Sequence, residues 1–241
     1  MGNAILIAAR ELRGFFRSPL GFVIAAAVLL VDGLLYYAVA LGGQARLSAE
    51  VLRDFFYFTS GTTMVAAILL SMRLFAEERQ TGTFTLLNTA PVRDGEIVAG
   101  KFLSGFALVA GLTALTIYMP LLIFVHGRVS IGHILVGYLG LLFLGAASVA
   151  IGLFGSVLAK SQVVAAILGA AILVVLLVLW MVARETDPPL QAYLTGLALH
   201  NARFRPFMLG QLELEHCVYY TAVTYFFLLA STKTLEARRW R

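Results

Sequence analysis

The first candidates for a catalytic group in this chain are two adjacent carboxylates, Glu77 and Glu78. A glutamate pair in an apolar protein suggests an intramembrane protease, but such an enzyme needs an arginine spaced after the pair on the same helical face. Here Arg79 follows directly and Gly82-Thr83 interrupts the helix, so the pattern does not fit. We expect no catalytic residue on this segment.

The other reactive residue types are no better placed for catalysis. No serine and histidine meet within the apolar runs, so no nucleophile is paired with a base. The stretch 155–161, GSVLAKS, lacks the glycine before Lys160 that a phosphate-binding loop requires, and it follows an apolar helix rather than a strand. Any ATPase must therefore be a separate chain. No metal site is predicted, because no second ligand lies four residues from any of the histidines, His126, His133, His200 and His216.

Asp32 lies near the middle of the first apolar run. An ionisable side chain at that depth is costly in lipid, so it is a candidate polar site within the membrane. The alternative, favoured because no basic residue lies at matching depth, is a hydrogen bond to a neighbouring helix or a position on a hydrated internal face. In either case we expect Asp32 not to face lipid, where a charge costs about 2.5–3.5 kcal/mol.

The composition indicates where the chain resides. Of the 241 residues, 60% are hydrophobic and 13% are charged, against about 25% charged residues in a soluble domain. This predicts an integral membrane protein. The net charge of +5 is spread over loop ends, so no nucleic-acid partner is expected. The single cysteine, Cys217, excludes an internal disulfide.

Six continuously apolar runs are each near the roughly 20 residues that cross a bilayer as a helix. A stripe of small residues in the fourth run, including Gly145, Gly152 and Gly155, predicts a packing surface between helices. The expected fold is a single all-α transmembrane domain over residues 1–241, with spans at about 20–42, 55–75, 97–124, 134–158, 163–183 and 216–232.

Residues 3–17 are expected to form an amphipathic helix in the headgroup layer, because apolar and basic residues alternate at helical spacing. Ile5, Leu12 and Phe16 share one face, and the arginines Arg10, Arg13 and Arg17 lie opposite. The alternative is a basic flank that only sets topology. Residues 184–215 are expected to form an outer loop with short helices on the surface, with a re-entrant hairpin as the alternative.

The distribution of basic residues predicts the orientation. With six spans, 12 of the 18 lysines and arginines lie on the side of the two termini, which leaves 18 − 12 = 6 on the other side. Basic residues are enriched in cytoplasmic loops, so both termini and the segment 76–96 are expected in the cytoplasm. The six residues expected outside are Arg46, Arg53, Arg128, Arg184, Arg203 and Arg205.

The segment 76–96, AEERQTGTFTLLNTAPVRDGE, holds a large share of the charge. Its first charged residues are expected to extend the second helix beyond the membrane, and the apolar side chains that follow favour contact with a partner surface. We interpret the segment as a short coupling helix on which a cytoplasmic ATPase acts. A solvated loop is the alternative. The residues assigned to coupling are Glu77, Glu78, Arg79, Gly82, Thr83, Phe84, Leu87 and Pro91.

Four regions of the chain resemble the permeases of ABC-2 type transporters. The pattern after the second span is Glu77…Gly82-Thr83…Leu86-Leu87…Pro91-Val92…Glu96-Ile97…Gly100-Lys101. Three further regions resemble the gliding-motility branch of that family: RELRGFFRSPLGF at 10–22, SVLAKSQVVAA at 156–166, and HNARFRPFMLGQLELEHCVYY followed by LEARRWR at the end.

The resemblance implies a permease subunit without a catalytic site, which works with two copies of an ABC ATPase and a second permease, most simply as a homodimer. ATP and Mg²⁺ would bind to the ATPase, and this chain would bind no cofactor. The expected function is export of a substrate across the bacterial plasma (inner) membrane. The alternative is a module that transmits ATPase-driven mechanical work, for motility or envelope remodelling, to an accessory protein outside the membrane.

The predicted topology can be tested by cysteine labelling. In a Cys217→Ser background, Gln191→Cys is expected to react with an impermeant thiol reagent in intact cells and Gln80→Cys is not, because only residues 184–215 are expected outside. Both sites should react after the cells are opened. Labelling of Gln80→Cys alone in intact cells would reverse the topology.

Overall fold

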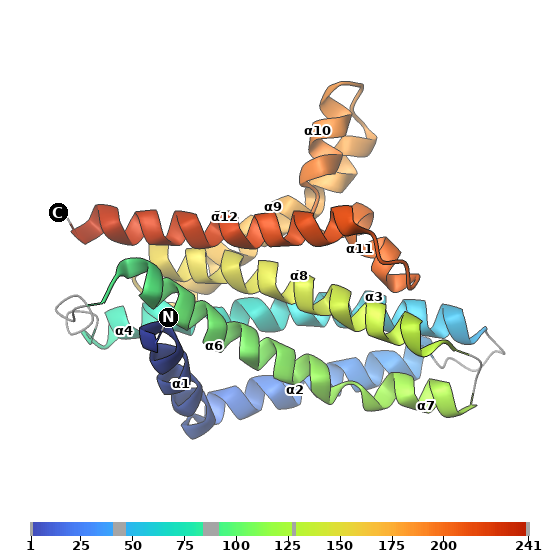
Figure 1. Ribbon diagram of the computed structural model, residues 1–241, viewed down its shortest axis with the longest axis horizontal. Helices are drawn as coiled ribbons and strands as arrows, with labels where there is room; N and C mark the ends of the chain where they lie inside the picture. Colours follow the sequence, from blue (N-terminus) through green and yellow to red (C-terminus); the bar gives the residue numbers. More distant parts are fainter. Residues whose placement is uncertain (1, 41–46, 84–91, 127–128, 240–241) are drawn as a thin grey trace.

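The computed structural model of the protein describes residues 2–40, 47–83, 92–126 and 129–239, and within these ranges it is helical without strands (Figure 1). The expected all-α fold is therefore confirmed for the described residues. In Figure 1, α1 crosses the direction of the long helices, whereas α3, α8 and α12 run along it. The helices are α1 (Gly2–Arg17), α2 (Pro19–Leu35) with the π-helical turn η1 (Tyr36–Ala40), α3 (Ser48–Ser71), α4 (Arg73–Gln80), α6 (Asp94–Leu115), α7 (Tyr118–His126), α8 (Ile131–Leu158), α9 (Gln162–Arg184), α10 (Leu190–Leu197), α11 (Asn201–Met208) and α12 (Leu214–Arg239).

Five helical stretches in the described ranges are long and apolar enough to cross a membrane. They correspond in order to the first five predicted runs. The sixth predicted run, 216–232, lies within α12, which has 26 residues but is less apolar, since it contains several tyrosines and threonines and ends in charged residues. By length and composition the structure therefore gives five spans, one fewer than the sequence predicted: Gly21–Ala38, Ser48–Gln80, Asp94–Val125, Ile131–Leu158 and Gln162–Arg184.

The third predicted span is not one straight helix, because it bends between α6 and α7. The hydroxyl of Thr113 donates to the carbonyl of Val109 (2.8 Å), and that of Thr116 donates to the carbonyl of Thr113 (2.8 Å). Threonine hydroxyls that bind carbonyls of the preceding turn compete with the helical ladder and favour such bends. The hydroxyl of Tyr36 then donates to the carbonyl of Met119 (3.1 Å) and holds the start of α7 against η1.

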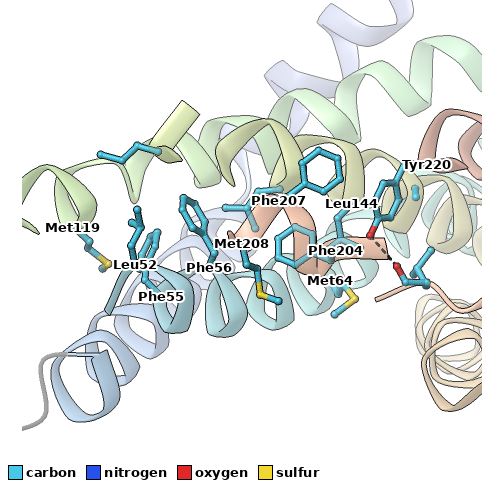
Figure 2. Close-up of a cluster of buried hydrophobic side chains, with 14 of the residues drawn as sticks. Leu52, Phe55, Phe56, Met64, Met119, Leu144, Phe204, Phe207, Met208 and Tyr220 are labelled. Carbon is cyan, nitrogen blue, oxygen red and sulfur yellow. Dashed lines mark hydrogen bonds between the residues drawn. The ribbon is translucent and has the colours of Figure 1, made fainter. Parts of the chain in front are cut away.

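The largest buried cluster joins α3, α8, α11 and α12 (Figure 2). Phe56, Phe204, Phe207 and Tyr220 are fully buried there. The hydroxyl of Tyr220 donates to the carbonyl of Leu199 (2.8 Å), so even the polar atom of this ring is satisfied. Aromatic side chains of this size dominate the packing of the end of the bundle where α11 lies.

The segment between α9 and α12 does not lie on the surface throughout. The amide of Leu199 donates to the carbonyl of Leu176 (3.2 Å), eight residues before the end of α9. At 1.5 Å per residue the chain has returned about 12 Å along α9 by that point. α11 buries Phe204 and Phe207 against the bundle while Arg205 is exposed. The outer surface loop and the re-entrant hairpin both stay predictions.

The small residues of α8 form a packing surface, as the sequence predicted. Gly145, Gly152 and Gly155 are buried or nearly so, and a Cβ atom added at Gly155 would lie 2.7 Å from the backbone nitrogen of Gly169 in α9. The two helices therefore approach until their backbones touch, which the absence of side chains at both positions allows.

Substitution of Gly155 tests this contact. Gly155→Ala is expected to destabilise the protein by about 1–3 kcal/mol, because the new methyl group meets backbone atoms that cannot rotate away. Thermal unfolding in detergent measures the effect. Gly61→Ala on α3 is the matched control, because a Cβ there meets nothing within 4 Å. Equal melting temperatures of the two variants would contradict the close approach of α8 and α9.

Candidate functional site

Several charged side chains meet at the end of the bundle where α4 continues α3. The helix breaks at Met72, and Ser156 of α8 holds the break: its hydroxyl accepts from the amides of Phe75 and Ala76 (both 3.0 Å) and donates to the carbonyl of Met72 (2.9 Å). Leu74, Phe75 and Ala76 are buried. The first turn of α4 is therefore fixed rigidly to α8.

The centre of the site is Lys101 of α6, whose side chain is fully buried. Its ammonium lies 3.0 Å from Oε1 of Glu11 in α1 and 3.0 Å from Oε1 of Glu78 in α4. The ring of Phe75 covers the same ammonium at 5.1 Å. Arg10 adds a second cation, 3.0 Å from Glu78 and 2.9 Å from Glu11. We call Arg10, Glu11, Glu78 and Lys101 the ionic cluster.

The ionic cluster is electrostatically balanced, with two carboxylates and two cations from three helices. Burial alone disfavours the charged carboxylate of Glu11, but Lys101 and Arg10 outweigh this effect and lower the pKa of Glu11. The carboxylate therefore stays ionised near neutral pH. A buried lysine needs such partners, because an uncompensated charge inside a protein is strongly destabilising.

Two further arginines tie α4 to its neighbours. Arg73 forms a two-pronged ion pair with Glu77 (2.8 and 2.9 Å) and donates to the hydroxyl of Ser18, between α1 and α2 (3.1 Å). Its guanidinium also lies over the ring of Phe15. Arg73 thus connects the start of α4 to the turn that leads from α1 into α2.

Arg79 connects α4 to the end of α8. Its guanidinium donates to the carbonyls of Val157 (2.5 Å) and Ala159 (2.9 Å). Arg238 of α12 donates to the carbonyl of Leu158 between them (3.1 Å). The last carbonyls of a helix lack partners within the helix and carry partial negative charge, so two guanidinium groups are well suited to this end.

α1 is packed directly on the start of α6. A Cβ atom at Gly100 would lie 2.7 Å from the carbonyl oxygen of Ala4, so glycine is required for this contact. The side-chain nitrogen of Asn3 donates a hydrogen bond to the carboxylate of Glu96 (3.2 Å). α1 is therefore held along its length by α6, which places Glu11 beside Lys101.

The structure locates only part of the segment that the sequence assigned to ATPase contact. Glu77, Glu78 and Arg79 all bind partners within the chain, and Gly82 (φ 75°) ends α4 in the left-handed conformation that glycine favours. Thr83 follows, and its hydroxyl lies 3.0 Å from that of Thr81. The remaining residues assigned to coupling, Phe84, Leu87 and Pro91, lie outside the described residues.

Sequence reasoning missed three members of the site: Arg10 as a partner of Glu78, Glu11 and Lys101. Lys101 offered a signal, since it follows Gly100 on a helix that is otherwise apolar for many residues. A lysine at that place requires a carboxylate close by. Its partner Glu11 is 90 residues away in the sequence, and no spacing rule identifies it.

Asp32 is separate from the ionic cluster. Its side chain is 3% exposed and accepts a hydrogen bond from the hydroxyl of Thr62 in α3 (2.6 Å). It lines a small internal cavity with Thr59, Thr63 and Thr113. The structure therefore gives it the interhelical hydrogen bond that the sequence analysis weighed as an alternative to a functional role.

The histidines whose side chains are described bind within the chain. His133 lies 2.8 Å from the carbonyl of Met208, and His200 lies 2.6 Å from the hydroxyl of Ser60. His216 lies 3.1 Å from Glu213. The described residues contain no group of three or more His, Cys, Asp or Glu side chains that could hold a metal ion.

Several apolar helices of membrane-spanning length define this chain as a multi-pass membrane protein. Residues 5–201 match the family described as ABC-2 family transporter protein, so the chain belongs to this family. No curated protein matches the chain. Membrane proteins of the family work with ABC ATPase partners and usually form dimers. The finer assignment to the gliding-motility branch stays a prediction.

The ionic cluster can be tested by charge removal. The double substitution Glu11→Gln and Glu78→Gln is expected to destabilise the protein by about 3–5 kcal/mol, because it leaves Lys101 buried without a carboxylate. Adding Lys101→Met should recover most of this loss. Equilibrium unfolding in detergent at neutral pH measures both steps.

One control variant and a pH dependence accompany this measurement. Glu236→Gln breaks the exposed pair with Lys233 (2.7 Å) and should change stability by less than about 1 kcal/mol. Because the pKa of Glu11 is lowered in the folded state, its contribution is complete above the ordinary pKa of a glutamate and is lost as the pH falls below it. A double variant as stable as the wild type would contradict the assigned role of the cluster.

Proposed function

We propose that this chain is the permease subunit of an ABC exporter, driven by a separate cytoplasmic ATPase that contacts the segment between α4 and α6. The observation that carries the proposal is the attachment of α4. Ion pairs and hydrogen bonds join it to α1, α6 and α8 and to the turn between α1 and α2. A force applied beyond Gly82 would therefore act on most of the bundle at once.

The segment 76–96 fits this role by its position. It begins in α4 and ends in the first turn of α6, and the ionic cluster joins those two helices. A loop on a flexible tether would absorb motion, whereas a helix extension fixed by buried charge transmits it. We propose that Glu77, Glu78 and Arg79 act through their contacts inside the chain, and that Phe84, Leu87 and Pro91 provide the surface that meets the ATPase.

We further propose that α12 is the sixth span. Its 26 residues cover about 39 Å, more than the hydrocarbon thickness of a bilayer. It packs along α8, from Tyr220 beside α11 to Arg238 at the end of α8. In Figure 1 the C-terminal end of α12 lies near α4, which supports a common side for both termini and the coupling segment. Basic residues favour the cytoplasm for that side, in the inner membrane of a bacterium.

A homodimer with two ATPase chains is the working unit that we propose. The spans in α2 and α9 are the least buried of the five, and both are strongly apolar. An open groove of about 750 Å³ lies between these helices and α3, and its mainly apolar wall includes a few polar side chains, among them Ser60, His200 and Asn201. A second copy placed against α2 and α9 would enclose this groove as half of a conduit for the exported substrate.

The coupling segment can be tested by purification. Phe84→Asp together with Leu87→Asp is expected to weaken retention of the ATPase subunit about 30-fold, as for the loss of a central apolar contact of an interface. Affinity purification in mild detergent, with the ATPase quantified by mass spectrometry, measures the effect. The spans should remain folded, because both residues lie outside the six predicted apolar runs of the sequence.

A matched control changes the opposite end of the bundle. Leu212→Asp with Leu214→Asp introduces the same charges at positions that are 58% and 78% exposed, and it should leave ATPase retention unchanged. If both variants retain the ATPase as the wild type does, the segment is not the contact. If no ATPase accompanies the wild-type chain, the proposed function itself fails.

A further inference from the structure

The small cavity beside Asp32 lies between α2, α3 and α6, next to the bend between α6 and α7. Its volume of about 10 Å³ is close to the room that one water molecule needs. Its wall includes no lysine, arginine or histidine of the described residues. The wall is apolar apart from five side chains that carry oxygen: Asp32, Thr59, Thr63, Thr113 and Thr116. We call this space the Asp32 cavity.

Asp32 has one carboxylate oxygen left for a ligand. Its Oδ1 accepts from the hydroxyl of Thr62 (2.6 Å), and its Oδ2 has no hydrogen-bond partner among the described residues. The residue is 3% exposed, so bulk water does not hydrate the carboxylate. A buried carboxylate without a positive charge at short range is strongly unfavourable, and more so inside a membrane. Because Asp32 lines the cavity, an occupant of the cavity can supply that charge.

Two threonine hydroxyls of the wall have already donated their protons elsewhere. Thr113 donates to the carbonyl of Val109, and Thr116 donates to the carbonyl of Thr113 (both 2.8 Å). A hydroxyl has one proton and two lone pairs, so these oxygens can offer an occupant only lone pairs. Carboxylate and hydroxyl oxygens are the ligands of hard cations. The hydrogen bonds of the wall therefore favour a cation over an anion.

The end of α6 adds partial negative charge beside the cavity. The amides of Thr116 and Ile117 donate three residues back, to the carbonyls of Thr113 and Ala114 (both 3.2 Å), rather than four. The regular helical ladder thus stops where Thr113 and Thr116 line the wall. The last carbonyls of a helix favour cations, and interrupted helices within the membrane are used in this way to bind sodium ions or protons.

We infer that the Asp32 cavity binds one sodium ion, held by the carboxylate of Asp32 and by threonine hydroxyls of α3 and α6. One carboxylate balances one positive charge, which favours a monovalent cation over a divalent one. The small volume favours sodium over the larger potassium ion. A water molecule would fill the same space but would leave the charge of the carboxylate uncompensated.

The bound ion joins three helices at one point. It adds a contact among α2, α3 and α6 that does not depend on apolar packing. Val28 of α2 lines both the Asp32 cavity and the groove beside α9, so occupancy of the cavity fixes the wall of the groove that α2 forms. The inference concerns ion binding by this chain alone and is independent of ATPase contact and of export.

Binding of radioactive sodium to the purified full-length chain in detergent tests the inference. One ion per chain is expected to bind, and unlabelled sodium chloride should displace it whereas choline chloride should not. Asp32→Asn keeps an oxygen that can accept from Thr62 but removes the charge, so sodium affinity should fall by about 30-fold or more. A wild-type chain that binds no sodium, or an Asp32→Asn variant that binds it equally well, would overturn the inference.

The contribution of α6 is tested by removal of one hydroxyl. Thr113→Val keeps the shape of the side chain and should weaken sodium binding about tenfold. Thr224→Val on α12 is the matched control, because Thr224 also donates to a carbonyl four residues back, that of Tyr220 (2.8 Å), and does not line the cavity. Equal sodium affinity of these two variants would contradict the site.

Thermal unfolding of the wild type distinguishes sodium from a proton and needs no variant. At mildly alkaline pH and equal ionic strength, sodium at about tenfold above its dissociation constant should raise the Tm by about 3–6 °C relative to choline. Potassium should raise it less. If a proton were the occupant, lower pH would stabilise the protein in choline chloride and sodium would have no effect. That result would replace the sodium ion by a proton and overturn the inference.

Discussion

The arrangement of this protein depends on one buried cation, the ammonium of Lys101. A lysine without solvent contact requires carboxylates at short range, because the desolvation cost of an unpaired charge is several kcal/mol or more. Glu11 and Glu78 supply them from two different helices, each at 3.0 Å. The geometry of the ion pairs therefore sets the mutual position of α1, α4 and α6. Helices that share only apolar contacts could slide past one another at little cost, whereas these three cannot.

The rest of the bundle packs tightly around α8 and leaves α2 and α9 less covered. α8 is in contact with α3, α9, α11 and α12, and its glycines allow backbones to touch. α2 and α9 pack against fewer neighbours and expose much of their apolar surface. In lipid such surfaces are not unstable, since acyl chains are as apolar as leucine. They are free to bind lipid or a second subunit, while the tightly packed helices maintain the shape of each copy.

The polar groups inside the bundle follow the same rule as Lys101. Asp32 accepts from Thr62, Tyr220 donates to Leu199, and Ser156 satisfies three backbone groups at the break between α3 and α4. In an apolar environment an unsatisfied polar atom is costly, so each of these hydrogen bonds stabilises the observed arrangement of the segments that it joins. The break between α3 and α4 occurs where the hydroxyl of Ser156 binds the backbone.

The sequence by itself determined the helices and the class of the protein. Long apolar runs must be helical in lipid, because the backbone can satisfy its hydrogen bonds only internally, and the predicted runs agree with the observed helices within a few residues for most spans. The alternation of arginines and apolar residues in 3–17 likewise predicted α1. The glycine stripe of α8 predicted close packing for a local reason: without side chains, nothing keeps a neighbouring helix away.

Only the tertiary structure decided which distant residues meet. Glu78 was assigned to coupling as part of the charged extension of the second helix, and nothing in the sequence indicated that it binds Lys101 and Arg10, 68 residues away in the latter case. Likewise, the sequence did not indicate which helices α11 packs against. Its burial depends on Gly140 of α8, where a Cβ would lie 2.5 Å from that of Phe207. Ion pairs and close packing form between residues that the fold brings together. The spacing of these residues along the chain does not indicate that they meet.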